Sequence, residues 1–598
     1  MDQPLEAVSE KGSARRLDSW KEIATYLNRD VTTVQRWERR EGMPVHRHVH
    51  DRAGSVYAFP AELDAWLQSR KPRLGEEEKE PPVAQTPGEA PTVIEVGRRM
   101  ATFSPQVRLW IAISGVVLLA LLAAAYAITR SQAANASKTQ IRSLAVLPLK
   151  NLSGDPTQEY LADGMTEALV GSLSTIHDLR VISRTSVMRF KDTQLSVPEI
   201  GKTLHVDAIV EGSVIREGSR IRIHAQLIRA STDEHFWSES YDRDLRDVLD
   251  LQSDVAQAIA RKVKVTVSGE EHARLTARHS VSPEVYENYL KGRSILDKSF
   301  STSQLKESIG YFEEATKRDP TFAPAYVGIA DAYDKLGTIF IGTPPSEVRP
   351  RVVNAARKAL ELDPGLTEAH VLLADVYQEQ WRWSDAEAEY NRALDLNPND
   401  AAANVGFAHW LLCQGRTQEA LTWTARGREL DPIEVSGTSI GETLFFARRY
   451  DESIRELRSV LAVQGDSASA LWYLGFSLIA KGQPKDAIPV LEKAVSITNR
   501  SPGVIGVLIR AYARAGRRED ALPLLDELKR RQRKGYVPAG AFVNAYLGLG
   551  EKEQTFAWLE RAYQEQSNIL QFLKVHPFFD PIRGDPRFAD LVHRVGLG

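Results

Sequence analysis

The spacing of hydrophobic positions changes several times along the 598 residues. Near the amino end, apolar residues recur every three or four positions, which is typical of amphipathic helices. A run without charged residues follows at 109–128, and residues 141–268 then contain stretches in which apolar and polar residues alternate, as in half-buried strands. Helical spacing returns over 283–566. The pattern therefore predicts several domains of different types.

Two short helices and a hairpin are predicted near the amino end. Ser19 can cap a helix that ends at Tyr26, and Asp30 can cap a second helix that begins at Val31. The short polar turn between them is typical of a helix-turn-helix. A strand–turn–strand pattern over 45–59 predicts a hairpin, or wing, after the second helix.

The second helix and the wing carry the residues that we expect to contact DNA. Val31, Val34 and Trp37 repeat at three-residue spacing and are predicted to face the core. Arg and Gln on the other side can form paired hydrogen bonds with base edges, and basic wing residues suit phosphates. The predicted DNA-binding residues are Thr32, Thr33, Gln35, Arg36 and Arg39 in the groove and Arg47, His48 and Arg52 in the wing.

The run LDSWKEIATYLNRDVTTVQRWERREGMPVHRH, followed by GSVYAF and ELDAWL, resembles the winged helix of MerR-like and excisionase-like DNA-binding proteins. The resemblance implies that the second helix enters the major groove and that the wing contacts the adjacent backbone. The chain lacks the long dimerisation helix that follows this fold in MerR proteins. A helix-turn-helix also serves as a protein-docking module, which is the alternative.

Charge supports double-stranded DNA as the partner of this segment. Residues 15–73 contain 12 Lys and Arg against 8 Asp and Glu, whereas the whole chain contains 76 against 79. The basic excess is therefore local. His46, His48 and His50 alternate and offer an alternative metal site, but no carboxylate or cysteine completes it in sequence. No metal or cofactor is expected.

A linker and a membrane span are predicted next. Residues 74–106 are rich in Pro and Glu, which is typical of a flexible linker. The 20 residues of 109–128 would form a helix of about 30 Å, the thickness of the hydrocarbon core of a bilayer. The sequence thus predicts a single transmembrane helix with lipid as its partner. Three basic residues flank each side, so charge alone does not fix the topology.

Residues 141–268 predict an α/β domain, because strand-like runs alternate with amphipathic helices before three successive strands. Gly201-Lys202-Thr203 resembles the end of a phosphate-binding loop, but Ser196 stands where its first glycine is required. No nucleophile elbow or zinc-protease motif occurs there. The runs LAVLPLKNLSGDP, YLADGMTEAL and DAIVEGSV resemble the TolB amino-terminal-like domain, which implies a binding role and no catalytic residues.

Internal repeats fill the remainder. Small residues at Ala386, Ala420, Ser453 and Ala487 are 34, 33 and 34 positions apart, and Asp-Pro or Asn-Pro pairs recur every 34 residues from Asp363. This period is the tetratricopeptide signature, and its stacked helical hairpins leave a groove for a peptide or protein ligand. A rigid spacer without a ligand is the alternative. The single cysteine, Cys413, excludes internal disulfides and is expected to be a packed residue.

The predicted fold class is multidomain: a small winged helix-turn-helix, a single transmembrane helix, an α/β domain, and then an all-α tetratricopeptide solenoid. The predicted segments are 15–73 for the winged helix-turn-helix, 74–106 for the linker, 109–128 for the span, 141–268 for the α/β domain, 283–566 for the repeats and 567–598 for a carboxyl-terminal cap.

This order resembles membrane-anchored one-component transcription regulators of bacteria. It implies a membrane-tethered, DNA-binding regulator that senses a signal or protein partner through extracytoplasmic α/β and tetratricopeptide domains. The expected location is the inner membrane, with the amino end in the cytoplasm and the carboxyl end in the periplasm. A homodimer would let two amino domains engage paired half-sites. The alternative is a membrane-anchored scaffold that uses the winged helix for docking; an enzyme is the third and least favoured hypothesis.

Overall fold

A computed structural model describes two parts of the chain. The described residues are 17, 19–27, 29, 31–41, 43–47, 56–60, 62–63 and 66 in the amino-terminal part and 141–276, 281–297, 301–338, 343–433 and 436–598 in the remainder. Internal contacts divide the chain into one unit at Met1–Ala112 and a second at Ile113–Gly598.

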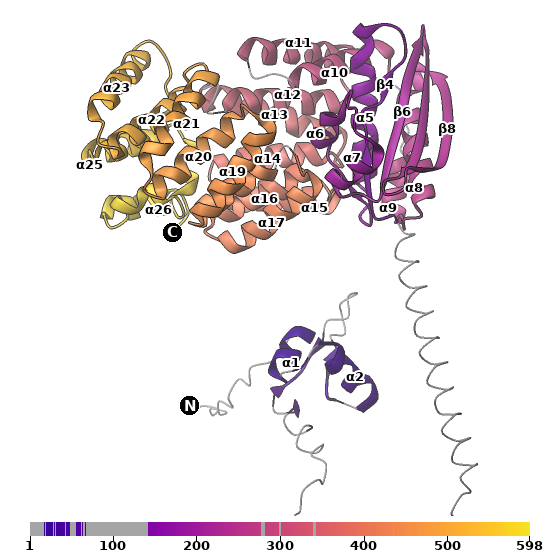
Figure 1. The fold of residues 1–598 in the computed structure, drawn as a ribbon, viewed down its shortest axis with the longest axis horizontal. Coiled ribbons are helices and arrows are strands. Elements are labelled where there is room, and N and C mark those ends of the chain that lie inside the picture. Colours follow the sequence, from indigo (N-terminus) through magenta and orange to yellow (C-terminus); the bar gives the residue numbers. More distant parts are fainter. Residues whose placement is uncertain are drawn as a thin grey trace, which may run out of the picture. The chain divides into compact units, whose positions relative to one another are not determined.

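The amino-terminal unit contains two helices and a two-stranded antiparallel sheet, namely α1 (Trp20–Tyr26), α2 (Val31–Glu41), β1 (His46–Arg47) and β2 (Val56–Tyr57) (Figure 1). The hydroxyl of Ser19 accepts a hydrogen bond from the Glu22 backbone N–H at 3.2 Å, which is the predicted cap of α1. The buried core consists of Ile23, Ala24, Val34, Met43, Val56, Ala58 and Leu63.

A six-stranded mixed sheet forms the centre of the next domain. Its strands are β3 (Ser143–Val146), β4 (Lys150–Asn151), β5 (Arg180–Val181), β6 (Ala208–Glu217), β7 (Arg220–Arg229) and β8 (Glu234–Asp244). They are ordered β5-β3-β6-β7-β8, and β4 also pairs with β6. β3 is parallel to β5 and β6, whereas β6, β7 and β8 form an antiparallel meander.

The long hairpin of this sheet follows directly from the sequence pattern. Ile221 and Ile223 on β7 are fully buried, whereas the alternate residues Arg220 and Arg222 are exposed. Gly218 has φ of 62° in the two-residue loop between β6 and β7, a left-handed conformation that favours glycine. The predicted three-strand meander is thus present.

Helices cover both faces of the sheet. One face packs on α5 (Glu159–Ser174) and α8 (Val248–Val263), and the other packs on α6 (Arg184–Val187) and α7 (Val197–Leu204). Leu144 and Ala145 are neighbours on β3 and belong to these two different cores, as the two-residue period of a strand requires. The remaining elements are η1 (Pro156–Gln158), η2 (Met188–Phe190), η3 (Leu245–Asp247) and α9 (Gly269–Thr276).

Antiparallel helix pairs then form a solenoid, with the sheet domain at one of its ends (Figure 1). The helices are α10 (Pro283–Leu296), α11 (Thr302–Arg318), α12 (Ala323–Gly337), α13 (Pro345–Leu362), α14 (Thr367–Glu379), α15 (Trp383–Leu396), α16 (Ala401–Cys413), α17 (Thr417–Leu430), α18 (Ser436–Phe446), α19 (Tyr450–Gln464), α20 (Ala468–Ala480), α21 (Pro484–Ile497), α22 (Pro502–Arg514), α23 (Arg518–Gln532), α24 (Ala539–Leu549) and α25 (Lys552–Gln564). The chain ends with η4 (Asn568–Phe572), η5 (Pro577–Ile582) and α26 (Pro586–Arg594).

The repeat period has a structural basis in how successive pairs end and pack. Asp363 and Asn397 end α13 and α15 in an extended conformation, and Asp431 ends α17 in another non-helical conformation, because the proline that follows each of them disfavours a helical residue before it. Small residues that the sequence placed at fixed intervals, such as Ala386 and Ala420, are fully buried between helices.

The fold class needs one correction. Within the described residues, no helix combines the length and apolar character needed to cross a membrane. The longest, α13, has 18 residues but carries charged side chains along its length. The span predicted at 109–128 lies outside the described residues. The observed chain is mostly helical, with a repeat solenoid and a smaller sheet domain. The domain boundaries, linker, localisation and topology stay predictions.

The sheet domain is fixed to the solenoid by the turns between repeats. The Asn399 side-chain amide donates hydrogen bonds to the backbone carbonyls of Ser174, Ile176 and Leu179 at 3.0 to 3.3 Å. One repeat later, the Asp431 carboxylate accepts hydrogen bonds from the hydroxyls of two residues at the start of α6. Two consecutive repeat turns therefore hold the same end of the sheet domain.

Candidate functional sites in the amino-terminal unit and the solenoid

The core-facing residues of α2 pack as the sequence predicted. Val34 is fully buried, and Val31 and Trp37 pack against the same core. The Trp37 ring lies 5.6 Å from that of Trp66. Five predicted DNA-binding residues, Thr32, Thr33, Gln35, Arg36 and Arg39, lie on α2, and Arg47 lies on β1; His48 and Arg52 lie outside the described residues.

His46 has a structural environment in the small sheet. Its Nε2 lies 2.7 Å from a carboxylate oxygen of Glu62, and its ring stacks on Tyr57 with centroids 5.1 Å apart. The other two histidines of the possible metal site, His48 and His50, lie outside the described residues, and among the described residues no group of three or more side chains could hold a metal ion. His46 therefore joins the hairpin to the segment that follows it.

The second candidate site is the inner face of the solenoid, contributed by α14, α16, α18, α20 and α22. The carboxyl-terminal segment, residues 566–582, lies against this face. Phe572 stacks on Phe446 of α18 with ring centroids 4.5 Å apart and meets His409 of α16 edge-on at 4.9 Å. Aromatic contacts of this geometry stabilise beyond the area they bury.

An aromatic cluster continues this contact along the segment. Phe578 packs at 5.1 Å from the ring of Phe476 on α20, and the guanidinium of Arg510 on α22 lies 3.5 Å from the Phe578 ring centroid. His576 lies among the same rings, and burial holds the pKa of its imidazole well below the usual value, with nearby cations acting in the same direction. Burial therefore favours the neutral form of the His576 imidazole.

Polar contacts fix the position of the segment. The Gln378 side-chain amide donates to Gln571 at 2.9 Å, and the Arg349 guanidinium donates to the Gln566 carbonyl at 3.0 Å. Both hydrogen bonds join the segment to helices more than 190 residues earlier in the chain. The sequence predicts a cap over 567–598 but does not indicate that it lies against the inner face of the solenoid. The aromatic residues concentrated in the run HPFFDP are the sequence feature that could have indicated this contact.

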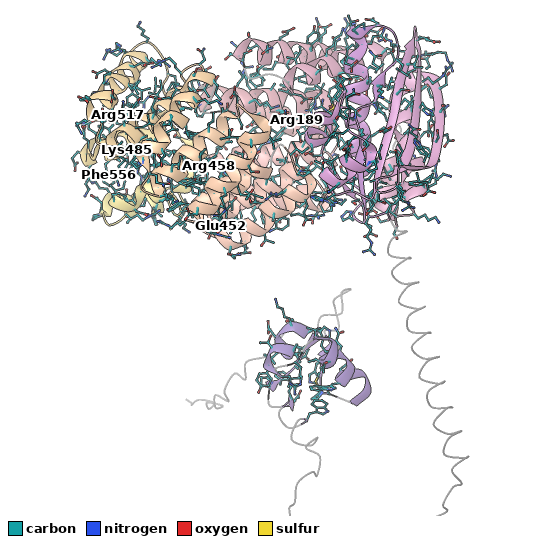
Figure 2. All side chains as sticks on the ribbon, viewed as in Figure 1. Arg189, Glu452, Arg458, Lys485, Arg517 and Phe556 are labelled. Atoms are coloured by element: carbon teal, nitrogen blue, oxygen red, sulfur yellow. The ribbon has the colours of Figure 1, made fainter. Side chains whose placement is uncertain are left out.

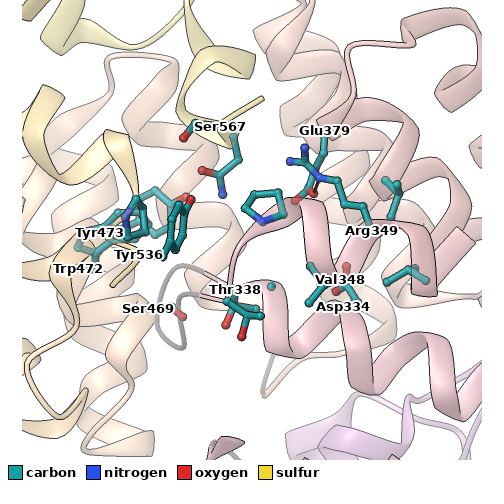
Figure 3. A pocket seen from close by; sticks show the side chains of 17 residues that line it. Asp334, Thr338, Val348, Arg349, Glu379, Ser469, Trp472, Tyr473, Tyr536 and Ser567 are labelled. Atoms are coloured by element: carbon teal, nitrogen blue, oxygen red, sulfur yellow. Dashed lines mark hydrogen bonds and ion pairs between the residues drawn. The ribbon is translucent and has the colours of Figure 1, made fainter. Parts of the chain in front are cut away.

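A cavity remains beside this segment. Its two adjoining chambers measure about 300 and 240 Å³ and share walls from α12, α14, α20 and the start of the carboxyl-terminal segment. Figure 3 shows Trp472, Tyr473 and Tyr536 on one side and Arg349 with Glu379 on the other. The Arg349 guanidinium and the Glu379 carboxylate form an ion pair at 2.7 Å.

Carboxyl groups in the cavity wall have altered acidity. Burial raises the pKa of Asp375 to about 6, although a hydrogen bond from Tyr390 acts in the opposite direction. Burial also raises the pKa of Asp334 well above the usual value, and the charges of Asp375 and Glu379 add to this effect. Perturbed carboxyl groups in a cavity mark a candidate binding site.

Known proteins resemble two parts of the chain. Residues 139–258, the sheet domain, match the second domain of HilA/YgeH-like transcriptional regulators. Tetratricopeptide repeats match residues 367–400, 438–502 and 478–538. These matches confirm the tetratricopeptide prediction and support a regulator-plus-repeat architecture. They do not confirm the MerR-like or TolB-like resemblance.

Curated relatives match over limited segments. A putative adenylate cyclase 3 of Rhizobium meliloti is 32% identical over 246 residues, which are 41% of this chain and 42% of that protein. The type IV pilus assembly protein PilF of Pseudomonas aeruginosa is 33% identical over 90 residues, 15% of this chain and 34% of that protein. The chain thus spans less than half the length of these relatives.

A solved structure of Pseudomonas aeruginosa PilF shares 19% identity, covers 40% of this chain and 98% of its own, and has a TM-score of 0.29. The tetratricopeptide repeats point to a protein-binding role. The sequence and the structure therefore describe a chain with a domain similar to HilA/YgeH-like transcriptional regulators and a tetratricopeptide solenoid.

Proposed function

We propose that the chain is a DNA-binding transcription regulator whose tetratricopeptide solenoid holds a peptide or protein partner. The observation that carries the proposal is the helix-turn-helix arrangement of α1 and α2, in which Ile23 and Val34 are fully buried in one shared core. The similarity of residues 139–258 to a domain of transcriptional regulators supports the same role. Signal sensing through the solenoid is part of the proposal.

Two copies of the chain would make this regulator effective. A single small helix-turn-helix contacts few base pairs, so pairing of two amino-terminal units raises the effective concentration of the second contact. We therefore expect a homodimer on paired half-sites. Light scattering of the full chain on and off a DNA fragment measures the stoichiometry, and one copy per site would contradict the expectation.

The first prediction concerns two arginines on α2. Replacement of Arg36 and Arg39 by Ala should weaken binding of the full chain to its genomic DNA sites by about 10-fold or more, because each arginine contributes contacts to bases or phosphates. It should also reduce the slope of log affinity against log salt. Fluorescence anisotropy with DNA fragments at several salt concentrations measures both.

The matched control removes the same charge elsewhere. Arg455 and Arg458 are exposed on α19 at the same three-residue spacing, and Figure 2 shows Arg458 on the solenoid. Their double replacement by Ala should leave DNA binding unchanged. Equal affinity of both double variants, or a salt slope near zero for the unaltered chain, would instead support a tetratricopeptide scaffold with a protein-docking amino domain.

A further inference from the structure

Carboxyl groups and aromatic rings line both chambers beside the carboxyl-terminal segment, together with the Arg349 guanidinium in the first chamber and His409 in the second. Asp334 and Glu379 line both chambers, and Asp375 lines the second. Trp472 and Tyr473 form a shared aromatic wall. A cavity of this size holds a small organic molecule.

The negative charges of this wall are only partly neutralised. Glu379 pairs with Arg349 at 2.7 Å. Asp375 accepts a hydrogen bond from the neutral hydroxyl of Tyr390, and the charge of His409 acts on it electrostatically. Within the described part of the chain, Asp334 has neither a hydrogen bond nor an ion pair, although Lys335 lies close enough to act on it electrostatically. A carboxylate in this position costs free energy unless a cation accompanies it.

Gln378 indicates independently that a hydrogen-bond donor is missing from the second chamber. Its side chain is 3% exposed and lines the second chamber. Its amide nitrogen contacts Gln571 and His409, both at 2.9 Å, whereas its oxygen has no hydrogen-bond partner among the described residues. An unpaired buried oxygen is rare in folded proteins and indicates an absent donor. Gln378 and the carboxylates thus require the same complement, a group with N–H donors.

The aromatic rings of Trp472 and Tyr473 favour N–H donors that carry a positive charge over neutral ones. The faces of Trp and Tyr attract cations within about 6 Å of the ring centre, and the attraction grows when water is excluded. Trp472 and Tyr473 lie next to each other with ring centroids 5.2 Å apart, and Tyr536 stands on the same side (Figure 3). A donor that carries positive charge therefore suits the aromatic rings as well as the carboxyl groups of Asp334 and Asp375.

From these observations we propose that the cavity binds a small organic ammonium ion, held by Asp334, Asp375 and the Gln378 oxygen against Trp472 and Tyr473. The ammonium group comes either from a free amine or from a lysine side chain of a peptide. The proposal goes beyond DNA binding and does not depend on it, because amine binding is measured without DNA.

Isothermal titration calorimetry of the full chain tests the proposal. The probe is 2-phenylethylamine, and the control ligand is 2-phenylethanol, which has the same shape without the charge. The amine should bind and the alcohol should bind at least 10-fold more weakly, since a hydrogen bond to a charged group contributes more than a neutral one. A lysine tripeptide and its acetyl-lysine counterpart identify the source of the ammonium group.

Two variants locate the site. Asp334→Asn should weaken amine binding by about 10-fold or more. Asp526→Asn on α23, an exposed carboxylate beside Lys529, should leave it unchanged. Circular dichroism should show both variants folded, since the asparagine keeps the shape of the side chain. Equal binding of amine and alcohol, no binding of either amine probe, or equal affinities of the two variants would overturn the proposal.

Discussion

At the residue scale, Asp375 shows how burial in the wall of a cavity disfavours the charged form of a carboxyl group. Its pKa of about 6 in the folded chain lies above the ordinary value of 3.8, because burial disfavours the carboxylate. Glu379 raises it further, whereas His409 and the Tyr390 hydroxyl lower it. Since the folded state binds more protons than the unfolded state between these two values, stability falls as pH rises through this window.

Asp375→Asn should therefore stabilise the protein at pH 7.5. We expect a gain of about 1 to 2 kcal/mol in the free energy of unfolding, less than the full shift implies because the side chain is not completely buried. The gain should be about half as large at pH 5. Urea unfolding at both pH values measures it. The exposed Asp526→Asn should show neither effect, and an equal gain at both pH values would contradict the assignment.

At the scale of the element, the solenoid depends on positions where two helices approach closely. A Cβ atom added at Gly506 on α22 would lie 2.3 Å from the carbonyl oxygen of Ala541 on α24. Because the obstacle is backbone, no side-chain rotation relieves it. In contrast, Gly310 on α11 faces open space. The same residue type thus has different roles on two helices of one solenoid.

Gly506→Ala should accordingly destabilise the chain by about 1 to 3 kcal/mol, the usual cost of overpacking a core. Gly310→Ala should be neutral or stabilising by about 0.5 to 1 kcal/mol, because alanine favours the helix. Thermal unfolding followed by circular dichroism compares the two variants. A melting temperature that changes equally in both variants would show that the contact of α22 with α24 does not decide the effect of the substitution.

At the scale of the whole molecule, the sheet domain and the solenoid are held together by buried polar contacts. Asn399 is 4% exposed, and its amide donates to three backbone carbonyls of the sheet domain. Loss of the amide would remove this donor from all three carbonyls, although Ile176 would still accept from the Leu179 N–H, and the loss of hydrogen bonds to buried acceptors costs free energy.

Asn399→Ala should loosen this junction more than it unfolds either part. Amide hydrogen exchange over residues 174–187 should become faster, and the free energy of unfolding should fall by about 1 to 3 kcal/mol. Asn391→Ala, on the exposed side of α15, is the control and should leave the exchange unchanged. Unaltered exchange in both variants would mean that apolar contacts alone hold the junction.

Much of the fold was predictable because its signals are local. The cap at Ser19 and the core positions Val34 and Trp37 follow from spacing within a single helix. The alternation on β7 likewise follows from neighbouring residues. The predicted DNA-binding residues rest on the same local reasoning and stay predictions, while the membrane span was the part of the fold class that needed correction.

The sequence by itself determined the repeat period and the helix-turn-helix pattern, because both arise from positions a few residues or one repeat apart. Only the tertiary structure decided that residues 566–582 lie against the inner face of the solenoid and that Asn399 holds the sheet domain. These contacts join residues 193 to 225 positions apart, as for Gln378 with Gln571 and Asn399 with Ser174. The repeat pattern of the sequence does not show which distant residues will be partners. These residues come into contact only when the whole solenoid has folded.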